Sequence, residues 1–434
     1  TTTSLVVVPN QIIDKELTAK KLSEILNTDY DDMLKHLNKK TSIERIHPEG
    51  RKLSFEIADK INSLNLDGVY LLKESKRNYP YNNLLSHVLG YVGIDNQGLS
   101  GIELAYDEYL KGEDGSIKYY SDGFGKKLEK ATVYNSPQSG MNVALTIDMN
   151  IQQAIENELD NVVTKYNPEQ ALIVVANPKT GEIYGMSSRP NFNPNEYNKY
   201  DLETINRNLP IFNTYEPGST FKVISLASSI QEKTINLFED KYFDSGSINV
   251  SGSRIKCWKH GGHGSQTFLQ VVENSCNPGF VVMGERLGKE RLIGYIKKFG
   301  FGEKTGIDLS GEENGILFDI DKMGPVETAT TAFGQGVSVT PIQQVMGVSA
   351  AVNGGHLYTP YLVSSISNAN TLDTVLVNKP KLKRDVISEE TSKLVRYALE
   401  SVVAKGTGRN AYLNGYRVGG KTGTAQKVKD GRYM

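Results

Sequence analysis

Few of the 434 residues belong to types that mark specialised protein classes: there are two cysteines, one tryptophan and six histidines. The 49 basic and 50 acidic residues leave a formal net charge of −1, so the chain lacks the basic surface that nucleic-acid binding requires. The longest apolar run near its start, residues 5–8, is far too short to span a bilayer, and no signal-peptide pattern is visible. The sequence therefore predicts no nucleic-acid partner and no membrane span of its own.

The length of the chain favours more than one domain, because 434 residues exceed what a single compact core usually holds. Hydrophobic residues make up 38% of the chain, as in ordinary globular proteins. Turn-forming residues gather at positions 136–140, where the local pattern changes. We therefore predict two domains, comprising residues 1–137 and residues 138–434.

The second region opens with a pattern typical of an α+β domain. A strand is predicted at residues 143–147, and Asp148 is placed to cap the helix that follows. Two apolar runs, residues 171–176 and 182–186, are separated by turn formers and predict an antiparallel hairpin. A strand, a helix and then a hairpin indicate an α+β fold rather than alternating β-α units.

Three short motifs place reactive side chains in the second region. They are Ser219-Thr220-Phe221-Lys222, Ser275-Cys276-Asn277 and Lys421-Thr422-Gly423-Thr424. A serine hydroxyl attacks poorly until a neighbouring base takes its proton. If Ser219 opens a helix, Lys222 lies one turn further on the same face, and burial would lower the pKa of its amine. The first motif alone also fits a serine N-cap beside a solvated lysine, so the functional reading depends on all three motifs together.

The third motif is the most specific of the three. A strand that borders a site needs glycine, here Gly423, where a substrate backbone approaches closely. Lys421 supplies positive charge for a carboxylate, and Thr422 and Thr424 supply hydroxyl donors. The backbone N–H groups of Ser219 and Thr424 are expected to form an oxyanion hole. The alternative, a glycine-rich loop with an exposed lysine, does not explain the paired hydroxyls.

This set resembles the S-x-x-K, S-D-N and K-T-G motifs of penicillin-binding proteins, and the chain resembles a class B penicillin-binding protein. The resemblance implies a serine D,D-transpeptidase that cross-links peptidoglycan stem peptides through an acyl-enzyme at Ser219, with Lys222 as the base. It implies that Ser275 passes the proton to the leaving amine, while Asn277 and residues 421–424 hold the donor peptide. β-Lactams, which mimic that donor, are expected to acylate the same serine.

The resemblance extends beyond the motifs. Residues 77–80 and 98–103 resemble the non-catalytic pedestal (dimerisation) domain of the family, and residues 333–343 and 406–408 resemble segments of its transpeptidase domain. It implies an elongated pedestal followed by a domain with an antiparallel sheet flanked by helices. It also implies a sheet that continues beyond the third motif, so the sequence is expected to be truncated at its C-terminal end.

The resemblance also implies a cellular setting. Family members work on the extracytoplasmic face of the membrane, held by an N-terminal anchor that is expected to be missing from this chain. A membrane glycan polymerase is the expected partner. The cysteines, one in C-W-K and one in S-C-N, resemble those of the sporulation-specific branch, which implies the forespore envelope and spore cortex synthesis.

Two readings of the cysteines remain open. Cys257, His260 and His263 recur at intervals of three, and with Cys276 they complete a Cys₂His₂ set for a structural zinc ion. An acidic residue such as Asp244 is a possible substitute for one ligand. In the sporulation branch the two thiols instead close a disulfide that switches the enzyme off until it is reduced. No other cofactor is expected.

Rival functions also remain open. A D,D-carboxypeptidase or β-lactamase would share the three motifs and admit water, although no dedicated deacylating glutamate is identifiable. A non-catalytic scaffold or β-lactam sensor is a rival from another class. Intact Ser219, Lys222 and Ser275 argue against an inactive scaffold, and a sensor would usually lack the long pedestal.

Overall fold

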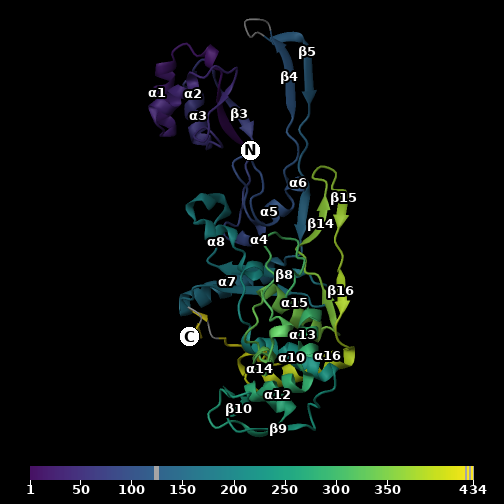
Figure 1. The fold of residues 1–434 in the computed structure, drawn as a ribbon. Helices are drawn as coiled ribbons and strands as arrows, with labels where there is room; N and C mark the ends of the chain where they lie inside the picture. The colour runs from purple at the N-terminus through teal and green to yellow at the C-terminus, as the bar shows by residue number, and fades with distance from the viewer. Residues whose placement is uncertain (122–126, 426–427, 430–431, 434) are drawn as a thin grey trace.

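The computed structural model describes residues 1–121, 127–425, 428–429 and 432–433. Figure 1 shows an elongated molecule, with a small N-terminal lobe and a long hairpin at one end and a mainly helical body at the other. Every pair of described strands is antiparallel, and helices make up much of the body, which confirms the predicted α+β class. Within the described residues, no helix combines the length and the apolar character that crossing a bilayer would need.

The N-terminal lobe is built on a three-stranded sheet. Strand β1 (Thr2–Val7) lies at its centre, between β2 (Glu44–Arg45) and β3 (Val69–Glu74). The helices of the lobe are α1 (Lys15–Leu26), α2 (Tyr30–Leu37) and α3 (Phe55–Ser63). Leu5, Leu22 and Leu37 are fully buried in one apolar cluster, so the lobe has a core of its own.

A second part of the N-terminal region leads into the body. Its helices are short, namely α4 (Ser86–Leu89), α5 (Gly101–Ala105) and α6 (Asp107–Leu110). The hairpin of β4 (Ser116–Ser121) and β5 (Lys127–Asn135) follows, and β6 (Asn142–Leu145) then joins a sheet with β14 (Val363–Ser367) and β15 (Thr374–Val377). The domain boundary predicted between residues 137 and 138 falls between β5 and β6 and remains a prediction.

The local predictions for the start of the second region are confirmed. Strand β6 is followed by α7 (Met149–Tyr166), and the Asp148 side chain caps this helix by accepting from the N–H groups of Asn150 and Ile151. Strands β7 (Ala171–Ala176) and β8 (Ile183–Arg189) pair as the expected hairpin.

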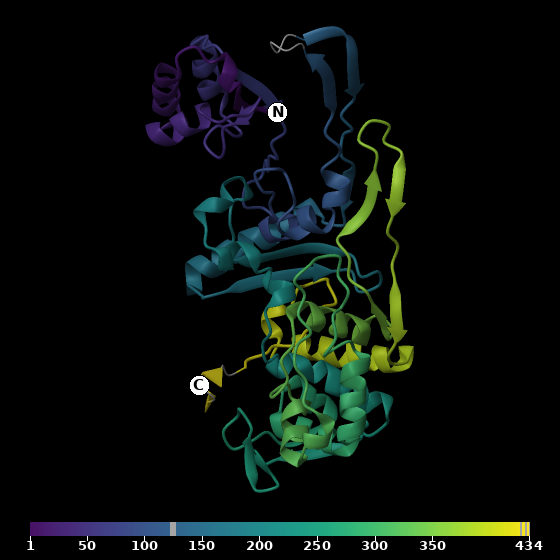
Figure 2. The same ribbon diagram turned by 45° about the horizontal axis from the view of Figure 1, so that its top comes forward.

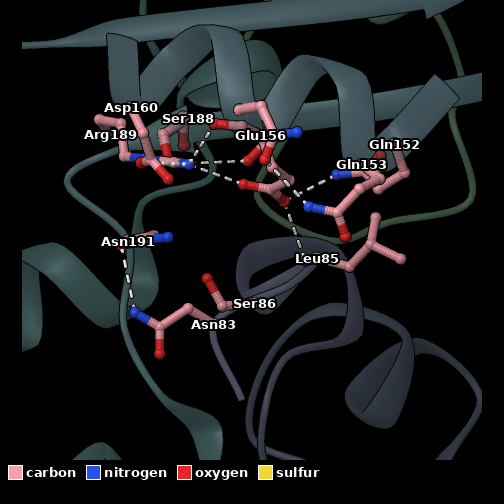
Figure 3. Close-up of polar contacts among 12 residues, drawn as sticks. Asn83, Leu85, Ser86, Gln152, Gln153, Glu156, Asp160, Ser188, Arg189 and Asn191 are labelled. Carbon is pink, nitrogen blue, oxygen red and sulfur yellow. Dashed lines mark hydrogen bonds and ion pairs between the residues drawn. The ribbon is translucent and has the colours of Figure 1, made fainter. Parts of the chain in front are cut away.

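A buried polar network joins the N-terminal region to α7 and β8 (Figure 3). The Glu156 carboxylate accepts from the Leu85 N–H at 3.2 Å and from Gln152 Nε2 at 2.8 Å. The Arg189 guanidinium pairs with Glu156 at 2.9 Å and with Asp160 at 2.8 Å. Because Leu85 belongs to the N-terminal region and the other residues belong to the second, this network fixes one region on the other.

The body packs around helix α10 (Lys222–Gln231), which is buried along nearly its whole length. Helices α12 (Asn277–Leu287), α13 (Lys289–Lys298), α15 (Pro341–Val352) and α16 (Glu389–Lys405) all contact α10. The remaining helices of at least four residues are α8 (Leu202–Asn206), α9 (Leu209–Phe212), α11 (Phe268–Glu273) and α14 (Pro325–Ala332). The remaining strand pairs of the body are β9 (Lys241–Asp244) with β12 (Gly264–Thr267), β10 (Ser247–Val250) with β11 (Ser253–Lys256), and β13 (His356–Tyr358) with β16 (Leu382–Asp385). Strands β17 (Val428–Lys429) and β18 (Arg432–Tyr433) form a separate pair near the C-terminus.

Candidate active site

The first motif lies where a short 3-10 turn runs into the central helix. Ser219 lies in the turn Gly218–Phe221, and Lys222 is the first residue of α10, as the sequence predicted. Ser219 is half-buried, whereas Lys222 is only 1% exposed. The hydroxyl of Ser219 makes no hydrogen bond within the part of the chain that the structure describes.

The Lys222 amine lies among oxygens of the second motif. Its Nζ is 2.9 Å from the Ser275 carbonyl oxygen, 3.1 Å from Ser275 Oγ and 2.6 Å from Asn277 Oδ1. Burial, and then the charge of Lys421, hold the pKa of Lys222 well below its usual value. A neutral amine has two N–H groups for the carbonyl and amide oxygens, which leaves its lone pair for a hydroxyl.

Ser275 connects the second motif to the third. It lies between α11, which ends at Glu273, and α12, and it has a left-handed φ of 51°. The Lys421 amine donates to Ser275 Oγ at 2.8 Å and to the Thr422 carbonyl oxygen at 2.8 Å. Burial lowers the pKa of Lys421 to about 8. One serine hydroxyl therefore lies between two lysine amines.

The third motif packs directly against the turn of the first. A Cβ at Gly423 would lie 2.7 Å from Thr220 Cγ2, so a larger residue would force the two segments apart. Gly218 has a φ of +55°, and a Cβ there would lie 2.5 Å from the Thr424 carbonyl oxygen. The expected glycine at 423 thus has a packing reason, and Thr424 lies beside the Ser219 turn.

The third motif does not form the strand that the sequence predicted. Residues 418–425 have no regular secondary structure, and the Gly420 N–H donates to the Leu399 carbonyl oxygen of α16 at 3.1 Å. Because this contact is to a helix, the motif is positioned by α16 and the Ser219 turn. Lys222, Ser275, Asn277 and Lys421 are joined by hydrogen bonds, whereas Gly423 and Thr424 meet the first motif by packing.

One polar partner of the site escaped the sequence analysis. Thr407 Oγ1 lies 3.4 Å from Thr422 Oγ1. The segment 406–408 had been assigned only to a family turn, and its Gly-Thr-Gly pattern gives no sign of a partner fifteen residues away.

Four side chains of types that can bind a metal ion lie close together, and one of them, Cys276, belongs to the second motif. The ligand atoms of Asp244, Cys257, His263 and Cys276 all lie within 4.8 Å of one another. His263 Nδ1 is 2.8 Å from Asp244 Oδ2 and 3.4 Å from Cys257 Sγ, and Cys276 Sγ is 3.4 Å from Asp244 Oδ2. One carboxylate, one imidazole and two thiols are a donor set suited to tetrahedral zinc, with ligand–ligand distances of roughly 3.3–3.8 Å.

The structure does not bring His260 into this cluster, and Asp244 lies there with Cys257, His263 and Cys276. His260 is exposed, in the turn between β11 and β12. Gly261 and Gly262 in this turn have φ values of 78° and 79°, so the chain reverses there and the regular spacing of three does not place His260 beside His263. Both cysteines are free thiols in the structure, and burial raises the pKa of each.

Known proteins resemble this chain over nearly its whole length. Residues 171–434 match the family described as "Penicillin binding protein transpeptidase domain", and residues 1–145 match the "Penicillin-binding Protein dimerisation domain". Stage V sporulation protein D of Bacillus subtilis (strain 168) is 58% identical over 429 residues, which cover 99% of this chain and 66% of that protein. Peptidoglycan D,D-transpeptidase FtsI of Escherichia coli (strain K12) is 30% identical over 417 residues, which cover 96% of this chain and 68% of that protein. The chain thus spans 66% and 68% of the length of these two relatives.

Solved structures share the fold. Penicillin Binding Protein 2X from Streptococcus thermophilus superposes with a TM-score of 0.76 at 22% identity, covering 100% of this chain and 69% of that one. Penicillin binding protein 3 from Mycobacterium tuberculosis gives a TM-score of 0.74 at 28% identity, covering 83% of this chain and 78% of that one. The resemblance predicted from the motifs is confirmed: the chain belongs to the penicillin-binding proteins that join a dimerisation domain to a transpeptidase domain.

Proposed function

We propose that the chain carries a serine D,D-transpeptidase that cross-links peptidoglycan stem peptides and is acylated by β-lactams. The observation that carries the proposal is the arrangement around Ser275, whose hydroxyl lies within hydrogen-bonding distance of both Lys222 and Lys421. With Lys222 neutral and Lys421 charged, Lys421 donates to Ser275 Oγ, and the Ser275 proton is free to point at Lys222. Ser275 can therefore take a proton from Lys222 and pass its own proton to another group.

In the proposed reaction, Ser219 Oγ attacks the carbonyl carbon of the terminal D-Ala-D-Ala bond, and Lys222 accepts the hydroxyl proton. The backbone N–H groups of Ser219 and Thr424 bind the oxyanion of the tetrahedral intermediate. When the intermediate collapses, the C–N bond breaks, and Ser275 gives its proton to the departing D-alanine amine while taking one from Lys222. An amine of a neighbouring stem peptide then attacks the acyl-enzyme, forms the cross-link and releases Ser219.

The substrate-binding roles belong to the same proposal. Lys421 attracts the substrate carboxylate, and the Thr422 and Thr424 hydroxyls are placed to donate to it. The Asn277 amide, whose oxygen contacts Lys222, has N–H groups left for the donor peptide backbone. Gly423 lets the segment lie close to the Ser219 turn, so the carboxylate and the reactive carbonyl are held side by side.

The cellular setting is proposed from the named relatives. Identity of 58% to Stage V sporulation protein D supports a role in spore cortex synthesis at the forespore envelope, on the extracytoplasmic face of the membrane. An N-terminal membrane anchor and a membrane glycan polymerase partner are part of this proposal.

We further propose that Asp244, Cys257, His263 and Cys276 bind a structural zinc ion. The Asp244 and His263 side chains are fully and almost fully buried, and the imidazole turns its Nδ1 toward Asp244 Oδ2 and Cys257 Sγ. An ion there would hold the ends of four chain segments together. Its role would be structural rather than catalytic, because protein ligands would fill all four coordination positions. The disulfide remains the alternative, since Cys257 and Cys276 lie in the same cluster.

The function is tested by labelling with a fluorescent penicillin and measuring intact mass. The wild-type protein is expected to gain one adduct, because the proposed base and the proposed oxyanion site both serve Ser219. Ser219→Ala should remove the adduct without changing the melting temperature by more than a few degrees. An adduct that survives the substitution would refute the assignment of the nucleophile.

The rival functions give different results in a second assay with a D-Ala-D-Ala peptide. A transpeptidase transfers the acyl group to an added amine, whereas a carboxypeptidase releases D-alanine to water at the same rate without the amine. A β-lactamase loses its penicillin adduct within minutes. A sensor keeps the adduct and releases no D-alanine from the peptide.

A further inference from the structure

The turn at residues 406–408 ties the third motif to the second. The Thr407 N–H donates to the Glu273 carbonyl oxygen at 3.0 Å, and Glu273 is the last residue of α11, two positions before Ser275. A Cβ at Gly406 would lie 2.3 Å from the same carbonyl oxygen, so only glycine allows the turn to approach this closely. The Glu273 carboxylate in turn accepts from the Ser401 hydroxyl of α16. The position of Thr407 is therefore set by the helix that leads to Ser275.

The side chain of Thr407 faces the third motif. Its Oγ1 lies 3.4 Å from Thr422 Oγ1, and both residues are exposed. Thr422 is also fixed through its backbone, because its carbonyl oxygen accepts from Lys421 Nζ. The hydroxyl of Thr422 thus has a single protein partner among the described residues, and that partner is Thr407.

We propose that Thr407 is a positioning residue for the substrate carboxylate. A hydroxyl has one proton to donate and two lone pairs with which to accept. In the structure the Thr422 hydroxyl donates to Thr407 Oγ1. When a carboxylate binds, the Thr422 proton turns to the carboxylate and Thr407 donates to Thr422 Oγ1 instead, and each hydrogen bond in such a chain strengthens the next. The Thr407 N–H donates to the carbonyl oxygen of Glu273, two residues before Ser275. The bound carboxylate would therefore keep a fixed position relative to Ser275. This inference rests on the proposed function and adds a residue to its substrate-binding site.

A merely structural role for Thr407 makes a different prediction, namely that its methyl group and shape matter and its hydroxyl does not. Thr407→Val keeps the shape and removes the hydroxyl, whereas Thr407→Ser keeps the hydroxyl and removes the methyl group. Both changes fall on an exposed side chain, so both variants are expected to fold with melting temperatures close to that of the wild type.

The experiment measures the second-order rate constant for acylation of Ser219 by benzylpenicillin and by its methyl ester, which lacks the carboxylate charge. Thr407→Val should lower this constant about tenfold with benzylpenicillin, which corresponds to one hydrogen bond of about 1.4 kcal/mol. With the methyl ester the loss should be less than about twofold. Thr407→Ser should stay within about threefold of the wild type with both compounds.

Two results would overturn the inference: an equal loss by Thr407→Val with acid and ester, or a loss by Thr407→Ser as large as that by Thr407→Val. Thr422→Val gives an independent check, because adding Thr407→Val to it should cost little more if the two hydroxyls act as a chain. Full additivity of the two substitutions contradicts the chain. Failure of the proposed function looks different, since the wild-type protein would then form no adduct at Ser219.

Discussion

The Ser275 hydroxyl lies between two lysine amines whose pKa values are both lowered. Lys222 is buried at the start of α10 and its pKa is held well below the usual value, first by burial and then by the neighbouring charge of Lys421. Burial lowers the pKa of Lys421 to about 8. The proposed reaction needs Lys222 neutral, because it acts as a base, and Lys421 charged, because it binds a carboxylate.

The lowered pKa values of Lys222 and Lys421 predict how the rate of acylation depends on pH. Above about pH 8 Lys421 loses its proton, so the rate constant for acylation by benzylpenicillin should fall, approaching tenfold per pH unit. At low pH the rate should fall again, because Lys222 becomes protonated and cannot accept the Ser219 proton. Lys421→Arg, which keeps its charge at all accessible pH values, should remove the alkaline fall. If that variant falls at the same pH as the wild type, another group is responsible.

At the scale of elements, the Asp244, Cys257, His263 and Cys276 cluster joins the end of β9, the ends of β11 and β12 and the start of α12. Cys276 is the N-cap residue of α12 and follows Ser275 directly. Trp258, next to Cys257, donates its indole N–H to the Asn274 carbonyl oxygen at 2.8 Å. A zinc ion in the cluster would therefore hold the loop that carries Ser275 from both sides.

The zinc proposal predicts about one equivalent of zinc in protein purified without added metal. His263→Ala should lose the metal and lower the melting temperature by several degrees, because metal bound to the folded state stabilises it. His260→Ala is the matched control, and it should keep both the bound zinc and the wild-type melting temperature, since His260 lies outside the cluster. Elemental analysis and thermal unfolding measure these outcomes. Less than about a tenth of an equivalent in the wild type removes the proposal.

At the scale of the whole molecule, the segment of α4 and α5 lies beside α7 and β8 (Figure 2), and polar contacts of the buried Glu156 side chain join the two (Figure 3). Glu156 binds Leu85 of that region, and Arg189 holds the Glu156 carboxylate. The Arg77 guanidinium and Tyr79 hydroxyl also contact Glu103, which braces the segment before α4 against α5. These contacts hold the segment that carries α4 and α5 on α7 and β8.

The two carboxylates that pair with Arg189 allow a matched pair of substitutions that tests the contact between the N-terminal region and the body. Glu156 has a side chain only 7% exposed, whereas the Asp160 side chain is 69% exposed, and both bind the same guanidinium. Glu156→Ala should lower the free energy of unfolding by about 3 kcal/mol, because it leaves a buried charge with less compensation. Asp160→Ala should change it by less than about 1 kcal/mol. Urea unfolding measures both values, and equal effects would argue against a buried joint.

The sequence by itself determined the features that act within a few residues. The spacing of Ser219 and Lys222 on one turn, the Asp148 cap and the β7–β8 hairpin all follow from local backbone geometry, and the structure has them as predicted. The order and chemistry of the three motifs were sufficient for the family.

Only the tertiary structure decided the contacts between distant segments. It placed Asp244 rather than His260 beside Cys257, His263 and Cys276, and two glycines with positive φ reverse the chain next to His260. It positioned the third motif on α16 and set Thr407 beside Thr422. A local pattern fixes dihedral angles over one turn, whereas contacts across many residues depend on how helices and loops pack, and no spacing in the sequence encodes that packing.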